Sequence, residues 1–477
     1  MSENLGMQAA YHAKRISLNS FFHDNEAKLF LFIGGINMKH AYLLHTGYGK
    51  TKLCLDLIMG ELNRPRTLLI STKNIVQTSW QAEINKWYAG QISYGYITGE
   101  IKESDRLLIL EKDYDMLGMN TEMLDWYISH TTDVKRKSYT KQGIKLHYDT
   151  DELINRFDLI IIDEVSLFKN SQSQRFKHLQ KWCHKVQHVL ILSATPTPKN
   201  IEDIWAPIFL LDGGQRLGKN ITKFREDYAI SIPLPNGYNR YQYSQESTDH
   251  ILSLIKDIST SVPKPDQPLF PEPILKRILI KPDDATLKLL TQFKHDYIAK
   301  LSNGKNLIAF SKTQMITKIN QISSGFVYTS DGTIAINDLK LRYLQQKIGL
   351  VLTPILIPYV YVADKEKLLQ LPGARLLQHE QDFKDWNNNL IKIGIISPFS
   401  AAHGLNLQDS ACQDVIWYSP IWDTERWIQL NARVCRRGQT KQITISVLLV
   451  KETFDEYAFD LCMEKFKVQY NNLVKLK

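Results

Sequence analysis

The sequence lacks the cysteine patterns of disulfide-stabilised and zinc-binding proteins. Its 477 residues include only five cysteines, and no two of them are spaced as C-x-x-C. Because secreted disulfide frameworks and structural zinc sites need paired cysteines, both kinds of protein are excluded. We expect the five side chains to be packed thiols: Cys54, Cys183, Cys412, Cys435 and Cys462.

Long hydrophobic runs and tracts of biased composition are also missing. The longest apolar stretch, residues 349–362, is too short to cross a membrane and contains Pro354 and Pro358. The beginning of the chain carries charged side chains and no apolar core. We therefore expect no signal peptide and no membrane segment, and we predict a cytoplasmic protein that is folded along its whole length.

Acidic residues are in the minority. The chain has 59 Lys and Arg residues against 50 Asp and Glu residues, which gives a net charge of +9. This surplus favours a polyanionic partner, with nucleic acid ahead of an anionic membrane surface, but it does not distinguish DNA from RNA. The length exceeds that of a single hydrophobic core, so we expect two domains.

Short apolar runs alternate with amphipathic segments in two parts of the chain, which is typical of parallel α/β sheets. In the first part, strands are predicted at residues 41–44, 67–70, 159–162 and 189–192, with helices at 51–63 and 75–87. In the second part, strands are predicted at residues 355–362, 393–397, 414–418 and 443–450, with helices at 364–371 and 424–435. A proline-punctuated region between the two parts predicts a connection.

Residues 44–51, Leu-His-Thr-Gly-Tyr-Gly-Lys-Thr, follow a predicted strand and open a predicted helix. This is the setting in which a P-loop wraps phosphates with backbone N–H groups. Lys50 would reach the β- and γ-phosphates of a nucleotide, and the Thr51 hydroxyl would bind Mg²⁺. We assign nucleotide binding to Thr46, Gly47, Tyr48, Gly49, Lys50 and Thr51. Taken alone, the segment is also compatible with an ordinary turn before a helix, and Leu44 departs from the full P-loop pattern.

Two further strand ends carry polar residues. Asp163 and Glu164 follow the apolar run 159–162, where Asp163 can hold Mg²⁺ and Glu164 can orient the attacking water. We expect their strand to neighbour the P-loop strand. Ser193, Ala194 and Thr195 follow the next run and can relay the state of the acidic pair to nucleic acid. Each segment alone could be an ordinary loop.

In this order the three segments resemble motifs one, two and three of superfamily 2 helicases, and the C-terminal third resembles the Swi/Snf-type branch, particularly its bacteriophage members. Gly404 to Gln408 resemble motif five, and Gln429-x-x-x-Arg433-x-x-Arg436-x-Gly-Gln resembles motif six. The resemblance covers residues 42–465. It implies an α/β fold with two RecA-like lobes, parallel sheets flanked by helices, and an ATP cleft between the lobes. We assign residues 1–225 to the first lobe, with a basic insertion at about 127–156, residues 226–330 to the connection, and residues 331–477 to the second lobe.

The resemblance also implies a second set of site residues. Negative charge builds on the γ-phosphate during its transfer, and an arginine from the opposing lobe can neutralise it. We expect Arg433 and Arg436 to share a helix face, with Arg436 as the arginine finger, Arg433 contacting phosphate, and Gln429 completing the catalytic set. Gly404, Asn406 and Gln408 would couple the lobes. The acidic segment reads Asp-Glu-Val-Ser rather than Asp-Glu-Ala-His, and no Q motif precedes the P-loop, so adenine selectivity rests on the resemblance.

Four residues match the nucleic-acid-binding motifs Ia and Ib of the family: Thr72, Lys73, Asn120 and Thr121. A basic stretch with interleaved aromatics, residues 135–148, predicts a hairpin. Its Lys135, Arg136, Lys137 and Tyr139 either touch a DNA fork, where a tyrosine stacks on an unpaired base, or belong to a solvated basic hairpin.

These observations predict an ATP- and Mg²⁺-dependent DNA helicase or translocase that acts on duplex, forked or branched DNA in replication, recombination or repair. If the chain is encoded by a phage, it acts in the cytoplasm of the bacterial host. A duplex translocase that does not separate strands, an RNA helicase, and an ATP-latched binding scaffold stay open as alternatives.

Overall fold

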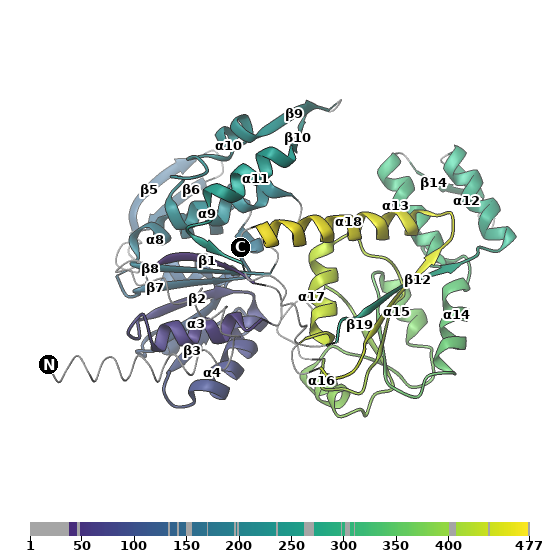
Figure 1. Ribbon diagram of the computed structural model, residues 1–477, viewed down its shortest axis with the longest axis horizontal. Coiled ribbons are helices and arrows are strands. Elements are labelled where there is room, and N and C mark those ends of the chain that lie inside the picture. The colour runs from purple at the N-terminus through teal and green to yellow at the C-terminus, as the bar shows by residue number, and fades with distance from the viewer. Residues whose placement is uncertain are drawn as a thin grey trace.

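The computed structural model describes residues 38–475, apart from residues 45–47, 132–133, 141–142, 149–154, 169, 195–196, 198–199, 235–236, 262–270, 297, 301–305, 310, 400–406 and 437–438. The described chain forms two α/β lobes that lie side by side (Figure 1). The first lobe runs from purple to teal in the figure and the second from green to yellow. The predicted fold class is confirmed.

The first lobe is built on a seven-stranded parallel sheet of order β11-β1-β8-β7-β2-β4-β3. Every residue of β2, β7 and β8 is buried, because helices cover both faces of the sheet. This explains why these strands read as continuous apolar runs. The strands are β1 (Lys39–Leu43), β2 (Thr67–Ser71), β3 (Tyr94–Ile97), β4 (Met116–Asn120), β7 (Leu159–Asp163), β8 (His188–Ser193) and β11 (Ser259–Thr260).

The helices of the first lobe enclose two hydrophobic cores, one on each face of the sheet. The predicted helix at 51–63 ends at Met59, because the chain turns at Gly60 and takes positive φ angles at Asn63 and Arg64. The helical elements are α3 (Lys50–Met59), η1 (Ile75–Ser79), α4 (Trp80–Tyr88), α5 (Glu103–Leu110), η2 (Thr121–Met123), α6 (Leu124–Thr131), η3 (Val165–Phe168), α8 (Gln174–Lys185), η4 (Ile201–Ile204), α9 (Trp205–Asp212), α10 (Ile221–Tyr228) and α11 (Gln245–Leu254).

The second lobe has a six-stranded parallel sheet of order β12-β21-β20-β17-β19-β18. Its four predicted strands are present, but β17 ends at Pro358 and the following helix begins at Val362. The strands are β12 (Ile274–Ile280), β17 (Ile355–Pro358), β18 (Ala374–Leu376), β19 (Ile393–Ile396), β20 (Asp414–Trp417) and β21 (Thr444–Val450). The helices are α14 (Leu339–Ile348), α15 (Val362–Leu368), α16 (Glu380–Asn387), α17 (Thr424–Val434) and α18 (Phe454–Lys475).

The range assigned to the connection, residues 226–330, contributes to both sheets, which corrects the predicted boundaries. β11 joins the first sheet and β12 joins the second, so the passage between them is shorter than predicted. β11 has only two residues, and β12 is a largely exposed edge strand, so neither produces the apolar run that marks a buried strand. The rest of the range includes a small unit on the second lobe: α12 (Asp284–Asp296), β13 (Ile298–Lys300), β14 (Asn306–Ile308), α13 (Lys312–Ser323), β15 (Phe326–Thr329) and β16 (Gly332–Ala335).

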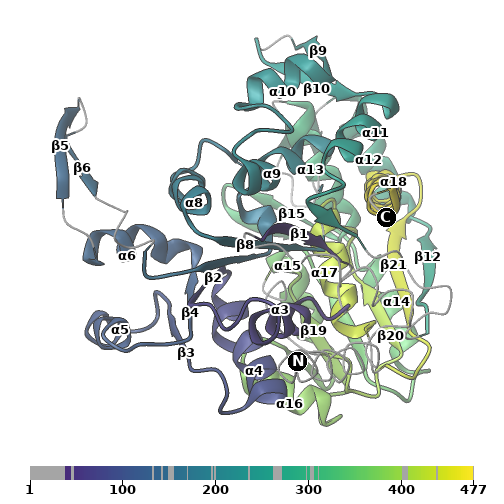
Figure 2. The same ribbon diagram turned by 60° about the vertical axis from the view of Figure 1, so that its left-hand side comes forward.

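Two hairpins project from the first lobe. The predicted basic hairpin is present as β5 (Val134–Thr140) and β6 (Gly143–Tyr148), which extend away from both lobes (Figure 2). A second hairpin, β9 (Ala229–Pro233) and β10 (Asn239–Tyr243), rises from α10. It stands on the same side of the molecule as α12 and α13 of the second lobe (Figure 1).

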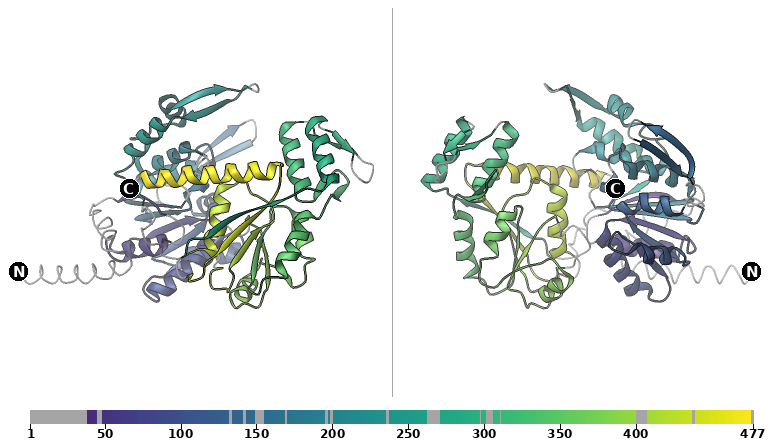
Figure 3. Two further views of the ribbon diagram at one scale, coloured as in Figure 1. Left: turned by 45° about the vertical axis from the view of Figure 1, so that its right-hand side comes forward. Right: turned by 180° about the vertical axis from the view of Figure 1, so that it is seen from behind.

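Helix α18 crosses from the second lobe to the first (Figure 3). Its last residue, Lys475, forms an ion pair with Asp249 of α11 in the first lobe. Within the part of the chain that the structure describes, no helix combines the length and the apolar character that a membrane crossing requires.

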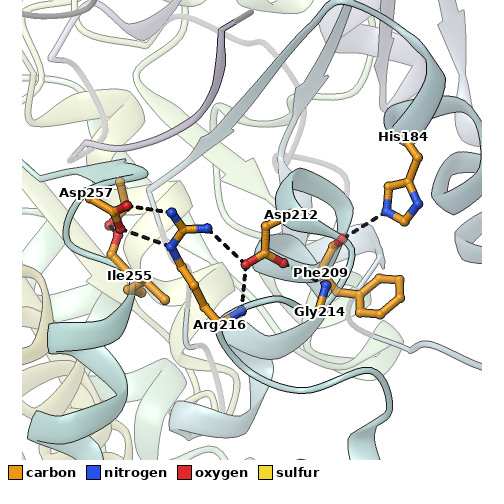
Figure 4. Close-up of polar contacts among 8 residues, drawn as sticks. His184, Phe209, Asp212, Gly214, Arg216, Ile255 and Asp257 are labelled. Carbon is orange, nitrogen blue, oxygen red and sulfur yellow. Dashed lines mark hydrogen bonds and ion pairs between the residues drawn. The ribbon is translucent and has the colours of Figure 1, made fainter.

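The end of the first lobe is held by a clamp around Arg216 (Figure 4). The guanidinium binds Asp257 through Nε at 3.0 Å and binds Asp212 through Nη1 at 3.2 Å. Asp212 also accepts the backbone N–H groups of Gly214 and Arg216. Asp257 lies two residues before β11, so the clamp holds the chain where it enters its last strand in this sheet.

Candidate nucleotide-binding site

The P-loop segment leaves β1 and enters α3 in the predicted way. Gly49 adopts a left-handed φ of 73°, which glycine allows without strain, and its carbonyl accepts the first helical hydrogen bond from Leu53 at 2.9 Å. Lys50 Nζ donates to the carbonyl of Leu44 at 3.0 Å. The N-terminus of α3 therefore faces the end of β1, where a phosphate would meet free N–H groups. Thr46 and Gly47 lie outside the described residues.

The acidic pair lies at the carboxyl end of β7, with β8 between it and the P-loop strand. The expectation of directly neighbouring strands is therefore wrong, because the later strand β8 inserts between β1 and β7. Asp163 is 9% exposed, and burial raises the pKa of its carboxyl. Its Oδ2 accepts the indole N–H of Trp80 at 2.9 Å, and its backbone carbonyl accepts the Ser71 hydroxyl at 2.7 Å.

Glu164 has a strained backbone. Its φ of 69° is in the left-handed region, and its N–H donates to the Leu192 carbonyl of β8 at 3.0 Å. A non-glycine residue in this region costs about 1–3 kcal/mol and is held there only by its surroundings. The bond to β8 ties the acidic pair to the strand that ends in Ser193 and Ala194, both of which are buried. Thr195 lies outside the described residues.

Arg433 and Arg436 of the second lobe lie close enough to this site to affect its charges. Burial lowers the pKa of Lys50; Asp163 and Glu164 oppose this, and Arg433 and Arg436 add to it. Burial also lowers the pKa of Arg433 to about 10, with the like charge of Arg436 as the next cause. The P-loop lysine, the acidic pair and both arginines therefore share one electrostatic site.

Helix α17 presents only part of the expected motif. It ends at Val434, and Cys435 leaves the helical conformation, so Arg433 and Arg436 do not share a helix face as predicted. Arg433 lies within the electrostatic reach of Asp163 and Glu164, whereas the acidic neighbours of Arg436 are Glu83 and Asp409. The two guanidinium groups therefore have different acidic neighbours.

Other residues of motifs five and six bind one another. Gln429 is buried, and its amide donates to Glu425 at 3.2 Å. The Leu407 N–H donates to the carbonyl of Arg433 at 3.2 Å, and the Gln439 amide donates to the carbonyl of Gln408 at 3.2 Å. A shift of this loop would therefore move the backbone of Arg433. Gly404 and Asn406 lie outside the described residues.

The predicted nucleic-acid contacts are spread widely. Lys73 is exposed and pairs with Glu100 at 2.5 Å, whereas Asn120 and Thr121 are each 5% exposed. The Asn120 amide donates to Glu122 at 2.6 Å, and the Thr72 hydroxyl is buried. Only Lys73 of these four presents a charged group at the surface. Lys135, Arg136, Lys137 and Tyr139 lie in β5, on the separate hairpin, and their side chains are outside the described set.

The residues present suit Mg²⁺ and a nucleoside triphosphate. Mg²⁺ prefers a few carboxylate and hydroxyl oxygens together with phosphate oxygens, which matches Asp163, Thr51 and a bound nucleotide. The desolvated carboxyl of Asp163, with its raised pKa, would be stabilised in its charged form by a nearby cation. Lys50 and Arg433 would supply positive charge for the phosphates.

Trp80 is the contact that sequence reasoning missed. Trp80 is fully buried, and its indole N–H also orients Asp163. The spacing of Trp80 in its predicted helix indicates only that the side chain is buried. No local pattern could have identified a partner 83 positions away in the sequence.

Comparison with known proteins finds one matching family model and several relatives. The model of the SNF2-related domain matches residues 28–322. Putative protein p41 of Acyrthosiphon pisum secondary endosymbiont phage 1 is 26% identical over 89% of this chain and 92% of its own length. The uncharacterized ATP-dependent helicase YqhH of Bacillus subtilis is 23% identical over 72% of this chain and 63% of its own length.

Longer relatives match over less of their length. The ISWI chromatin-remodeling complex ATPase ISW1 of Saccharomyces cerevisiae is 22% identical over 85% of this chain, which spans 36% of that protein. Among solved structures, the Sulfolobus solfataricus SWI2/SNF2 ATPase core in complex with dsDNA matches 94% of this chain and 93% of its own, at 16% identity and a TM-score of 0.38.

Proposed function

The chain belongs to the SNF2-related family of ATPases, and from this premise we propose that it is a motor that couples ATP hydrolysis to movement on DNA. The observation that carries the proposal is the composition of the site. Lys50, Asp163 and Glu164 come from one lobe, and Arg433 and Arg436 come from the other. Because the site is complete only when both lobes contribute, hydrolysis would be coupled to lobe movement.

Each residue has a distinct task in the proposed reaction. Lys50 leaves the Leu44 carbonyl to bind the β- and γ-phosphates, and Asp163, held by Trp80, helps to bind Mg²⁺. The ion would neutralise charge on the phosphate oxygens. Glu164 orients the attacking water, and Arg433 and Arg436 stabilise the charge that builds on the γ-phosphate. The arginine in closer electrostatic contact with the acidic pair is Arg433, which makes it at least as strong a candidate for the finger as Arg436.

The β5–β6 hairpin is our proposed DNA contact outside the lobes. Its register pairs Arg136 with His147 and Ser138 with Lys145, which places these four residues on one face. Lys137 and Tyr139 are on the opposite face with Leu146 and Ile144. An isolated two-stranded hairpin is marginally stable in water, so a bound phosphate backbone would stabilise it.

Charge reversal of one face at a time tests this contact. We expect Arg136→Glu with Lys145→Glu to weaken DNA binding by about tenfold and to reduce its salt dependence. Lys137→Glu, on the other face, is the matched control. Equal effects of the two variants, or no effect of either on DNA binding and fork unwinding, would contradict the assignment of the basic face.

The first experiment is steady-state ATP hydrolysis alone and with single-stranded DNA, blunt duplex, forked duplex and RNA. Stimulation by duplex or forked DNA, lost in Lys50→Ala, is the expected result. A duplex translocase would be stimulated without separating strands in a parallel unwinding assay. Stimulation by RNA alone would favour an RNA helicase, and no hydrolysis under any condition would favour an ATP-latched scaffold.

The biological setting is the finer part of the proposal. One relative is a phage protein, one is named an ATP-dependent helicase, and one is named a chromatin-remodeling ATPase. We place this chain in the cytoplasm of a bacterial host, acting on forked or branched DNA in replication, recombination or repair. Binding measurements that compare forked, four-way and linear DNA check this choice.

A further inference from the structure

The β9–β10 hairpin is anchored to the first lobe by the carboxylate of Glu202. Oε1 of Glu202 accepts Nη2 of Arg225 at 2.6 Å, and Oε2 accepts Nε of Arg225 at 3.1 Å and the hydroxyl of Tyr243 at 2.7 Å. The bond to Glu202 raises the pKa of Arg225, and burial together with the same carboxylate raises the pKa of Tyr243. Both donors therefore stay protonated, and hydrogen bonds to a charged acceptor are about twice as strong as neutral ones.

Glu202 belongs to the segment that follows the Ser193 strand end. Its backbone N–H donates to the side chain of Asn200 at 2.9 Å, which caps the helical turn η4. Ile201 and Ile204 of the same turn are buried in a core of the first lobe. The turn is therefore packed firmly, and the Glu202 carboxylate cannot move without the segment that carries it.

The other end of the contact is the base of the hairpin. The Tyr241 ring lies 4.5 Å from the Arg225 guanidinium, and the Tyr243 ring lies 6.0 Å from that of Phe224. Toward the tip, Leu234 is 39% exposed and Tyr238 is 73% exposed. Because the tip has little packing of its own, the direction of the hairpin depends on the contacts at its base.

The hairpin forms one wall of a groove of about 730 Å³ between the lobes. Thr197, Arg240 and Gln242 line it on the side of the first lobe, together with the carboxylate of Glu202. Lys465 and Asn472 of α18 line it on the side of the second lobe, together with that of Glu464. Thr197 is 5% exposed, and its hydroxyl has no hydrogen-bond partner among the described residues. Cations, amides and a hydroxyl that lie along a groove are the groups that bind the phosphates and sugars of a nucleic-acid strand.

We propose that this groove holds a DNA strand, and that Glu202 is a positioning residue that couples the β9–β10 hairpin to the Ser193 segment. The inference rests on the proposed motor function. When the Ser193 segment shifts with the state of the nucleotide, Glu202 carries the shift to Arg225 and Tyr243, and the hairpin wall moves against α18. The hairpin would thus be a moving contact with DNA rather than a passive protrusion.

Two variants test the coupling. Glu202→Gln removes the charge that Arg225 and Tyr243 bind, and Tyr243→Phe removes only the hydroxyl. We expect each to raise the DNA concentration for half-maximal ATPase stimulation, by about tenfold for Glu202→Gln and about threefold for Tyr243→Phe, while the rate without DNA changes less than twofold. The matched control is Tyr228→Phe, which makes the same chemical change in the same aromatic group.

The coupling role of Glu202 and the proposed motor function predict different failures. If Glu202→Gln left the DNA requirement unchanged, or lowered the rates with and without DNA equally, the coupling role would be wrong. If wild-type protein showed no stimulation by DNA, the proposed motor function would fail instead. As a direct readout, a photo-crosslinking amino acid in place of Tyr238 should label bound DNA in wild-type background and label it less in Glu202→Gln. An absence of labelling in wild-type background would overturn the groove assignment.

Discussion

Charged side chains are buried in two regions of this molecule, and the two regions balance their charges differently. In the cleft, the cations Lys50, Arg433 and Arg436 come from both lobes and lie near the carboxylates of Asp163 and Glu164, with Glu83 and Asp409 near Arg436. In the second lobe, Lys340 and Asp455 pair at 2.7 Å with each side chain 1% exposed, and Asp364 lies beside them, fully buried.

The difference lies in how each cluster is neutralised. Burial raises the pKa of Asp364 to about 7, so near neutrality this carboxyl is partly protonated and the cluster approaches zero charge. All of its members belong to one lobe. The charged groups of the cleft, in contrast, come from both lobes, so their balance depends on how the lobes and a bound polyphosphate come together. We infer that the charged groups of the cleft serve ATP turnover and that the buried cluster of the second lobe serves the stability of the fold.

The largest effects are expected in the cleft. Lys50→Ala and Glu164→Gln should each lower ATP turnover at least about 100-fold, by loss of phosphate contact and of water positioning respectively. Thermal stability should change little. The matched control is Lys52→Ala, since Lys52 is on the same helix but pairs with Asp56. Normal turnover in either variant would refute the site.

Substitutions in the second-lobe cluster should lower the stability of the protein rather than its ATP turnover. Lys340→Met leaves Asp455 buried without its cation and should lower the free energy of unfolding by about 3–5 kcal/mol. Urea denaturation measures this loss. Lys340→Met combined with Asp455→Leu should recover most of it, because the Asp455 carboxylate is then no longer left without its cation. If the double variant is no more stable than the single one, the ion pair is not the cause.

The pH dependence of stability distinguishes Asp364. Its pKa is raised from the ordinary 3.8 to about 7 by burial, against the opposing effects of Lys340, Ser419, the Tyr361 N–H and Lys367. Its contribution is fully present below pH 3.8 and is lost as the pH rises through 7, with a slope of at most about 1.4 kcal/mol per pH unit. Asp364→Asn should flatten the stability profile between about pH 4 and about pH 7. An unchanged profile would show that other groups cause the dependence.

The smallest effect is expected at Trp80. Trp80→Phe removes the donor to Asp163 but keeps most of the buried ring, so turnover should fall about tenfold, which is about 1.4 kcal/mol. The Mg²⁺ concentration for half-maximal turnover should rise as well. Trp182→Phe is the matched control, because Trp182 is buried in the same lobe and its indole N–H has no partner among the described residues. If the two substitutions lowered turnover equally, Trp80 would act only through packing.

The sequence predicted the parts of the site that depend on short segments. The strand before the P-loop, the helix that opens at Lys50 and the acidic pair at the end of β7 all follow from local apolar runs and turn residues. The expected helix face shared by Arg433 and Arg436 was wrong because α17 ends at Val434. Helix ends depend on tertiary contacts as well as on spacing, and here the Cys435 conformation ends the helix.

The order of the strands and the identity of the edge strands could not be predicted from the sequence, for a related reason. β8 lies between β1 and β7, and β11 and β12 join sheets although neither has a long apolar run. A pattern of residues shows whether a strand is buried but not which strand lies beside it. For the same reason, the sequence did not predict the contact between Trp80 and Asp163 or that between Glu202 and Tyr243.

The sequence by itself determined the chemistry of this protein: a phosphate-binding turn, an acidic strand end and an arginine-rich motif, each contained in a few neighbouring residues. Only the tertiary structure decided which of these groups share a site, which carboxyl is held by a tryptophan, and which buried carboxyl titrates near neutral pH. The physical reason is that desolvation and electrostatic interaction are sums over neighbours in space, and most of those neighbours are distant in the chain.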